Sequence, residues 1–266
     1  VQGVQSASAE GQLPTVSARV CSKCGYGHLG NDENPEPLSD VCDFCQHPLE
    51  DTARINHLYR IENVETKVQQ RISVNEEERQ RKGYDLQTTF RFLPGPGGQI
   101  EVVHCRVGEA EHPVAKATYS PAARIWRINR GWRRRKDKNQ LGFHINPLTG
   151  EWSRKEDPDR DKEEEEAASS RQKEKDPVQQ IVPYVEDHRN ILILSPEERL
   201  SESAMATVQA ALKRGIEQVF QIEDSELVVE PLPDRAERTA LLFYEASEGG
   251  AGVLNRIVQD SSQLAI

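Results

Sequence analysis

Four cysteines in two close pairs are the residues whose spacing most clearly predicts chemistry in this chain. Cys21 and Cys24 form the first pair, and Cys42 and Cys45 follow after seventeen intervening residues. Two such pairs about 15 to 20 residues apart are typical of a four-thiolate zinc site, because each pair bends a turn around the ion and the spacer lets the second turn complete the tetrahedron. We predict a structural Zn²⁺ bound by these four side chains, with no open position for catalysis.

Other interpretations of the cysteines stay open at this point. The pairs could be free thiols or a redox pair, and His28 and His47 beside them are weaker candidates as ligands. The fifth cysteine, Cys105, is expected to be a buried thiol. An odd number of cysteines without a recognisable signal peptide argues against a disulfide framework and favours a reducing compartment. No apolar run approaches the roughly 18 residues that cross a bilayer, so we expect a soluble, cytoplasmic protein with no membrane partner.

A basic stretch interleaved with tryptophans is the second candidate site. Between residues 124 and 138, eight basic side chains accompany a single acidic one, although the whole chain carries a formal net charge of -10. Such a cluster neutralises phosphates, and tryptophan rings can stack on unpaired bases. We therefore predict a nucleic-acid contact made by Arg124, Trp126, Arg127, Arg130, Trp132, Arg133, Arg134, Arg135, Lys136 and Lys138.

The same stretch has a second interpretation. If it forms a strand, alternate residues face opposite sides of the sheet. The tryptophans could then belong to the core, and the arginines could be solvated or paired with carboxylates from other parts of the chain. Spacing alone does not decide between the two.

A glycine-rich segment at residues 245–252, "EASEGGAG", joins an apolar strand to a predicted helix. Backbone amides at such a junction can bind an anion, but close packing of the turn is the simpler explanation. The segment has neither the Gly-Lys-Ser/Thr of a phosphate-binding loop nor the spacing of a dinucleotide fingerprint. Glu245 and Glu248 could act as acid and base, but the sequence supplies no partner. We find no catalytic motif and predict no catalytic residue.

Most of the remaining pattern predicts antiparallel strands followed by a mixed C-terminal region. Period-two alternation, apolar runs and turn residues indicate strands at 56–66, 84–93, 99–107 and 123–132, and a hairpin over 141–152 with its turn at 146–150. A capping box predicts a short polar helix over 73–83. Further along, we expect a strand centred on 191–194, a helix over 201–221, strands over 225–233 and 239–247, and a helix that begins near 253.

A charged segment divides the chain. Seventeen of the 23 residues from Arg154 to Asp176 are charged, so they cannot bury enough apolar surface to offset the entropy of ordering. We expect an α+β protein with a flexible segment at 1–17, a zinc-knuckle and antiparallel β domain at 18–153, a disordered charged linker at 154–177 and a small, truncated α/β domain at 178–266.

Four blocks of the sequence resemble a known family. They are "CSKCGYGH" with "CDFCQHPL", the segment 58–92, the segment 125–152 and "LLFYEASEGGAGVLNRIV". In this order they resemble the C-terminal portion of bacterial superfamily 2 helicases with an MrfA-like zinc-binding module, most of all those of DISARM anti-phage defence. The resemblance implies upstream motor domains that bind ATP and engage DNA, and the four cysteines match the family's knuckle pattern. The family pattern continues into further cysteines, which do not follow here.

Two functions follow from these patterns. The leading prediction is a non-catalytic accessory module of an ATP-dependent DNA helicase or translocase, with structural zinc and a basic DNA-contacting hairpin. The alternative is an assembly scaffold in which the arginines bind an acidic partner subunit and do not touch DNA. DNA, the motor domains of the same protein and a second defence subunit are therefore the expected partners.

Overall fold

The computed structural model describes residues 3–4, 11–31, 34, 39–50, 54–62, 64–65, 83–93, 100–106, 112–152, 177–247 and 250–259. Nearly all of the polar helix predicted at 73–83 and of the predicted charged linker lies outside these residues.

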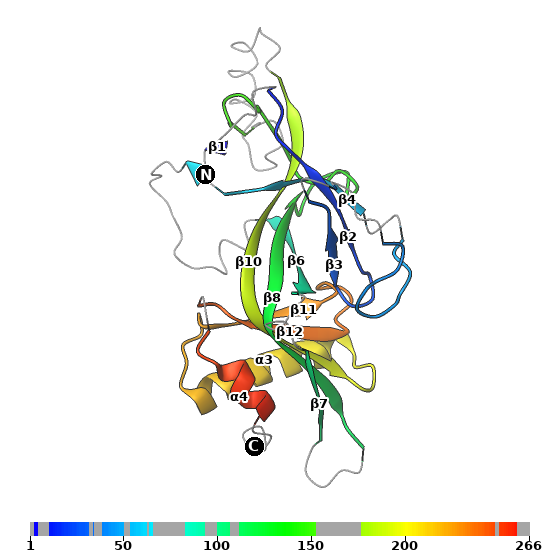
Figure 1. Cartoon of the computed structure of the whole chain (residues 1–266), viewed down its shortest axis with the longest axis vertical. Helices are drawn as coiled ribbons and strands as arrows, with labels where there is room; N and C mark the ends of the chain where they lie inside the picture. Colours follow the sequence, from blue (N-terminus) through cyan, green and yellow to red (C-terminus); the bar gives the residue numbers. More distant parts are fainter. Residues whose placement is uncertain are drawn as a thin grey trace.

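The described residues form an α+β fold that is mostly antiparallel sheet, which confirms the predicted fold class (Figure 1). Its helices are α3 (Glu202–Phe220) and α4 (Val253–Gln259). Its strands are β1 (Gly3–Val4), β2 (Val16–Val20), β3 (Gly27–Leu29), β4 (Arg54–Arg60), β5 (Val64–Glu65), β6 (Tyr84–Phe92), β7 (Glu101–Cys105), β8 (Ala115–Trp132), β9 (Phe143–Ile145), β10 (Gln179–Pro196), β11 (Leu227–Leu232) and β12 (Ala240–Glu245).

Two strands of 18 residues each, β8 and β10, run through most of the molecule and pair with one another antiparallel (Figure 1). Their register shifts between Arg189 and Ile191. A bulge of this kind bends a strand and increases its local twist. On one side of the shift the two strands belong to a barrel, and on the other side they belong to an open sheet.

The barrel follows from the order of strand pairing. β10 pairs with β4, β4 with β2, β2 with β3, β6 with β8, and β8 with β10. A parallel bridge between Tyr26 and Phe90 joins β3 to β6 and closes the ring of six strands. The Thr89 hydroxyl donates a buried hydrogen bond of 2.6 Å to the Gly25 carbonyl beside this seam. One buried cluster occupies the barrel: Ala18, Val20, Ile55, Leu58, Trp126, Ile128, Val182 and Tyr184.

The open sheet contains β11, β12, the other halves of β10 and β8, and β7. One face packs against α3 and α4 through a cluster that includes Met205, Leu241, Phe243 and Leu254. The opposite face packs against the cysteine loops through a second cluster, which includes Leu232, Leu242 and Phe90. The two faces explain why β12 is buried at every position and reads as a continuous apolar run.

Helix α3 begins where its sequence predicts. The Ser201 hydroxyl accepts a hydrogen bond of 3.2 Å from the Ala204 amide, which satisfies one of the free donors at the first turn. The helix ends at Gln221, whose left-handed backbone lets its amide bond back to the Glu217 carbonyl. Met205 and Ile216 are buried on the face that meets the sheet.

Strands from both sides of the charged segment share one sheet. β10 follows residues 154–177 in sequence, yet it lies between β8 and β12 and also pairs with β4. The division into two domains at this segment stays a prediction. In the described part of the chain, no helix is long and apolar enough to span a membrane.

Candidate metal centre and basic surface

The two cysteine pairs form two turns with the same hydrogen-bonding pattern. In the first, the Gly25 amide donates to the Cys21 carbonyl and the Cys21 amide donates to the Tyr26 carbonyl, both at 2.9 Å. In the second, Gln46 and His47 stand in the places of Gly25 and Tyr26, with distances of 2.9 and 2.8 Å. Gly25 and Gln46 both have a left-handed backbone, with φ of 74° and 58°. This repetition is expected of two knuckles that bind one ion from opposite sides.

The four sulfur atoms lie together. Their Sγ atoms are all within 4.8 Å of one another. The contacts between the two turns, Cys21 to Cys45 and Cys24 to Cys42, are both 3.6 Å. A tetrahedral zinc ion with bonds of about 2.3 Å places its sulfurs about 3.8 Å apart. The donor set and its spacing therefore fit a structural zinc ion.

The thiols of the cluster also shift one another's pKa values. Hydrogen bonds with the thiols of Cys24 and Cys42 lower the pKa of Cys21 and outweigh the effect of its burial, and the same hydrogen bonds raise the pKa of Cys24 and Cys42. A low pKa favours the thiolate form, which is the form that binds metal. The two histidines beside the knuckles do not belong to the cluster of four cysteines. His28 instead lies 3.5 Å from Asp43.

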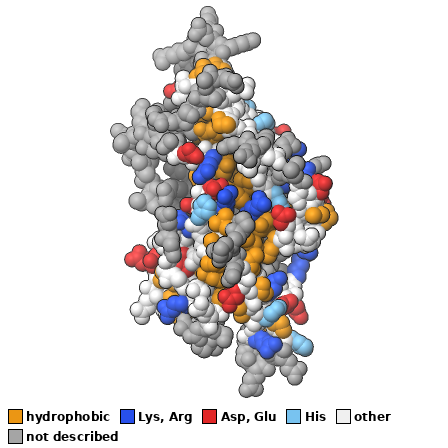
Figure 2. Space-filling view, viewed as in Figure 1, with side chains coloured by type: hydrophobic (Ala, Val, Ile, Leu, Met, Phe, Trp, Pro, Cys, Tyr) orange, Lys and Arg blue, Asp and Glu red, His pale blue; other side chains and the backbone are white. Residues whose placement is uncertain are grey.

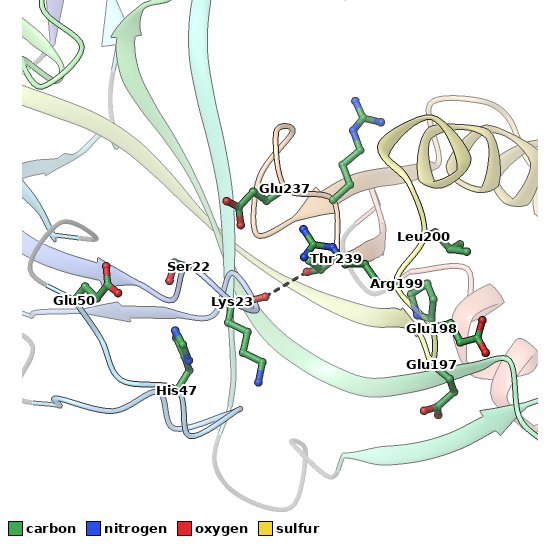
Figure 3. A pocket seen from close by; sticks show the side chains of 12 residues that line it. Ser22, Lys23, His47, Glu50, Glu197, Glu198, Arg199, Leu200, Glu237 and Thr239 are labelled. Carbon is green, nitrogen blue, oxygen red and sulfur yellow. Dashed lines mark hydrogen bonds between the residues drawn. The ribbon is translucent and has the colours of Figure 1, made fainter.

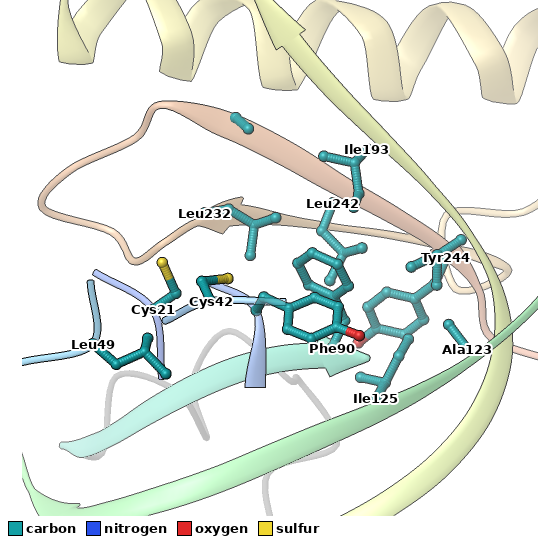
Figure 4. Packing of buried hydrophobic residues seen from close by; sticks show 13 residues of the cluster. Cys21, Cys42, Leu49, Phe90, Ala123, Ile125, Ile193, Leu232, Leu242 and Tyr244 are labelled. Atoms are coloured by element: carbon teal, nitrogen blue, oxygen red, sulfur yellow. The ribbon is translucent and has the colours of Figure 1, made fainter. Parts of the chain in front are cut away.

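The cysteine loops pack directly onto the open sheet. Cys21 and Cys42 are fully buried and share a cluster with Leu49 and Leu232 (Figure 4). A Cβ atom at Gly25 would lie 2.8 Å from the Leu232 side chain, so this glycine also permits close approach. A metal bound here therefore stiffens the contact between the knuckles and β11, in addition to the loops themselves.

A pocket of about 640 Å³ lies beside this contact. Figure 3 shows that it is formed by the knuckle residues Lys23 and His47, the segment 196–200 before α3 and the turn at 237–239. The Thr239 hydroxyl donates to the Lys23 carbonyl across it at 3.3 Å. Its lining mixes acidic and basic side chains and shows no nucleophile paired with a base, so it gives no basis for assigning a reaction.

Trp126 is placed in the core. Its side chain is 2% exposed and belongs to the cluster inside the barrel. Its ring Nε1 donates a hydrogen bond of 2.7 Å to the Glu186 carboxylate on the neighbouring strand. A base cannot stack on a ring that is buried in this way, so the second interpretation of the basic stretch applies to this residue.

Arg130 and Arg135 are held by an internal carboxylate. Asp85 accepts hydrogen bonds from Arg130 Nη2 at 3.1 Å and from Arg135 Nη1 at 3.0 Å. Arg135 also donates to the carbonyls of Trp132 and Lys138, which fixes the shape of the loop after β8. These two arginines therefore position the loop and leave little of their charge for a ligand.

Asp85 gives this network a pH dependence. Burial alone would raise the pKa of Asp85, but the charges and hydrogen bonds of Arg130 and Arg135 outweigh it and hold the pKa below the ordinary value of 3.8. A lowered pKa stabilises the fold above the unfolded-state pKa, and this stabilisation is lost as the pH falls through the folded-state pKa.

We expect the free energy of unfolding to decrease as the pH is lowered below about 5, and to decrease more steeply in the wild type than in Asp85→Asn. Urea unfolding between pH 7 and pH 3 measures this. Equal slopes for the two proteins would contradict the assignment.

The other members of the basic stretch lie nearer the surface. Trp132 is partly buried and stacks on Tyr84, with ring centroids 4.6 Å apart, and Phe143 and Trp152 continue the aromatic cluster. Arg127 is partly exposed. The remaining residues of the predicted set are exposed: Arg124, Arg133, Arg134, Lys136 and Lys138. Arg133 donates to the Tyr84 carbonyl at 3.2 Å, and the Lys138 ammonium donates to the Arg133 carbonyl. In the described part of the chain, the side chains of Arg134 and Lys136 have no hydrogen-bonding or ionic partner.

The glycine-rich segment binds an anion that belongs to the chain itself. Glu245 is 2% exposed. Its carboxylate accepts hydrogen bonds of 2.9 Å from the amides of Gly252 and Leu254 and from the Asn190 side chain. The residue thus caps the start of α4 and joins it to the bulge in β10. The sequence pattern indicates Glu245 as a candidate acid or base and the loop amides as a candidate anion site, whereas in the structure the amides of Gly252 and Leu254 donate to Glu245 itself.

Comparisons with known proteins find one family and one solved structure. Residues 208–265 match the family model described as the MrfA Zn-binding domain. This segment runs from α3 past α4 and contains no cysteine. The crystal structure of the DUF1998 helicase MrfA bound to DNA is 10% identical, with a TM-score of 0.31, and the match covers 67% of this chain and 20% of that chain. A TM-score this low gives no basis for inferring a shared fold or function. No curated protein matches the chain.

The zinc-binding family model and the four-cysteine cluster together confirm the predicted structural zinc. The cluster lies in the N-terminal quarter of the chain, whereas the matched segment lies at its C-terminal end. The identity of the four ligands stays a prediction, which metal analysis of single variants can test.

Proposed function

We propose that the chain is a non-catalytic accessory module of an ATP-dependent DNA helicase or translocase. The match of residues 208–265 to the MrfA Zn-binding domain supports the helicase class. ATP binding then belongs to motor domains elsewhere in the same protein. The finer assignment to a DrmA-like helicase of anti-phage defence, acting in the cytoplasm with a second subunit, rests on the sequence blocks alone.

Within this module, Cys21, Cys24, Cys42 and Cys45 hold the zinc ion. The ion's role is structural, because four protein ligands leave no position for a substrate or water. The knuckle lies against β11, and we infer that zinc keeps the barrel and the open sheet in a fixed relation.

DNA contact is assigned to the loop that follows β8. The observation that carries this proposal is the pair Arg134 and Lys136, which are exposed and have no partner among the described residues. Arg130 and Arg135 fix the shape of this loop through their hydrogen bonds to Asp85. Cationic side chains on a preformed loop lose less conformational entropy when they contact phosphates.

Replacing Arg134 and Lys136 together by alanine tests the DNA contact. We expect weaker binding of a labelled duplex and a log-log salt dependence that is shallower by about 1.8, because each lost phosphate contact removes about 0.9. Fluorescence anisotropy over a range of salt concentrations measures both. The matched control removes two exposed cations elsewhere, Arg106→Ala with Arg199→Ala, and should leave the slope unchanged.

The assembly scaffold is the second candidate function, and the same variants separate it from the first. If the loop variant binds DNA as the wild type does but no longer retains an acidic partner subunit in a pull-down, Arg134 and Lys136 bind the partner subunit and not DNA. If both variants weaken DNA binding equally, the effect reflects net charge alone and the loop assignment is wrong.

A further inference from the structure

Two arginines and a histidine lie in one row across the middle of the sheet. Arg124 of β8 is directly paired with Arg91 of β6 on one side and with His188 of β10 on the other. Directly paired residues point to the same face, with Cβ atoms about 4.5–5.5 Å apart. The sequence places these residues 33 and 64 positions from Arg124, so only the strand order reveals the row.

The row is exposed and only partly neutralised. Arg124 and His188 are exposed, and their side chains have no ion pair among the described residues. Arg91 is 43% exposed and lies 3.9 Å from Asp43. Figure 2 shows Lys, Arg and His side chains across the middle of this face, with Asp and Glu side chains lying among them.

Two other acidic groups near the row, Asp187 and Glu186, are engaged elsewhere. Asp187 pairs with Arg189 at 3.2 Å. Glu186, on the strand beside Trp126, accepts the indole hydrogen bond inside the barrel. Like charges placed directly opposite one another destabilise a sheet. A protein gains nothing in stability from this arrangement, and an anionic ligand that bridges the row would relieve the repulsion.

We propose that Arg91, Arg124 and His188 bind phosphate groups of a nucleic-acid backbone, as a contact separate from the loop after β8. This inference rests on the proposed DNA-binding function and adds a second site to it. A guanidinium group matches phosphate oxygens with two parallel hydrogen bonds. The imidazole can donate from one ring nitrogen even when it is neutral.

The row and the loop are far enough apart to act independently. Eight residues of β8 separate Arg124 from Trp132, where the strand ends, and an extended strand of that length spans about 26 Å. Sites farther apart than about 10 Å with no shared partner have additive free energies, so the two fold-losses in affinity should multiply.

The test compares Arg124→Gln with His188→Gln, made together, against the wild type, the loop variant and a combination of the two. The probe is a labelled duplex of about 20 base pairs, roughly two helical turns. For one lost phosphate contact, we expect the salt slope to become shallower by about 0.9, so that the loss of affinity at 0.1 M salt is about eightfold larger than at 1 M. Arg106→Gln is the matched control, because it also lowers the formal charge by one.

Each outcome decides a separate question. A loss of affinity in the row variant that multiplies with that of the loop variant supports both sites. A loss in the loop variant alone overturns the row and leaves the proposed function standing. A wild-type chain that binds no duplex overturns both proposals. A row variant that binds the duplex normally but loses an acidic protein partner shows that the row is a protein contact. Circular dichroism melts of all variants must match the wild type, and Arg124→Lys should restore binding in part.

Discussion

Replacing Cys42 with serine is expected to abolish zinc binding and to lower the free energy of unfolding by about 4 kcal/mol when free zinc exceeds the dissociation constant a thousandfold. Cys42 is fully buried and lies at the start of the second knuckle. Loss of one thiolate leaves three ligands and an incomplete tetrahedron. The effect should extend beyond the loops, because Cys42 packs in the same cluster as Leu232 of β11 and Phe90 of β6.

Elemental analysis of the purified chain measures the metal, and thermal unfolding with and without a chelator measures the coupling. We expect one zinc per wild-type chain and a chelator-dependent midpoint that Cys42→Ser no longer shows. Cys105→Ser is the control, because Cys105 lies outside the cluster of four. A folded wild-type chain without metal, or full zinc content in Cys42→Ser, would contradict the proposed ligand set.

Replacing Trp126 with alanine is the second change with a large expected effect. A buried tryptophan truncated to alanine costs about 3–5 kcal/mol, because apolar burial is lost and a cavity stays behind. Here the change also removes the hydrogen-bond donor of Glu186 inside the barrel. Urea unfolding followed by circular dichroism measures the loss. Trp132→Ala should cost less, because Trp132 is only partly buried.

Replacing Trp126 is expected to have little effect on the affinity for DNA. Trp126→Phe retains most of the apolar volume, and its affinity for the labelled duplex should equal that of the wild type. If Trp126→Phe instead weakens DNA binding while its unfolding midpoint is unchanged, the ring contacts nucleic acid and its place in the core is wrong. Measuring both variants keeps the question of stability separate from that of binding.

The local features of this chain could be predicted from the sequence because they depend on neighbouring residues. The spacing of the cysteine pairs sets the two knuckle turns, since each pair closes its own hydrogen-bonded loop. The period-two pattern at 84–92 and the start of the helix near residue 201 likewise depend on short-range geometry. The polar first half of β10 was missed. Residues 185–190 alternate little in polarity, and pairing with β8 holds them in the strand.

Tertiary structure alone decided which basic and acidic residues are free to contact a ligand and which are buried or paired within the chain. Trp126 and Arg124 lie two positions apart on the same strand, yet one fills the barrel and the other is exposed, because β2 and β4 cover only part of that face. Asp85 and Glu245 acquire their partners from segments distant in the chain or across a turn. Period-two alternation tells which residues share a face, but only the long-range pairing of strands determines what covers that face.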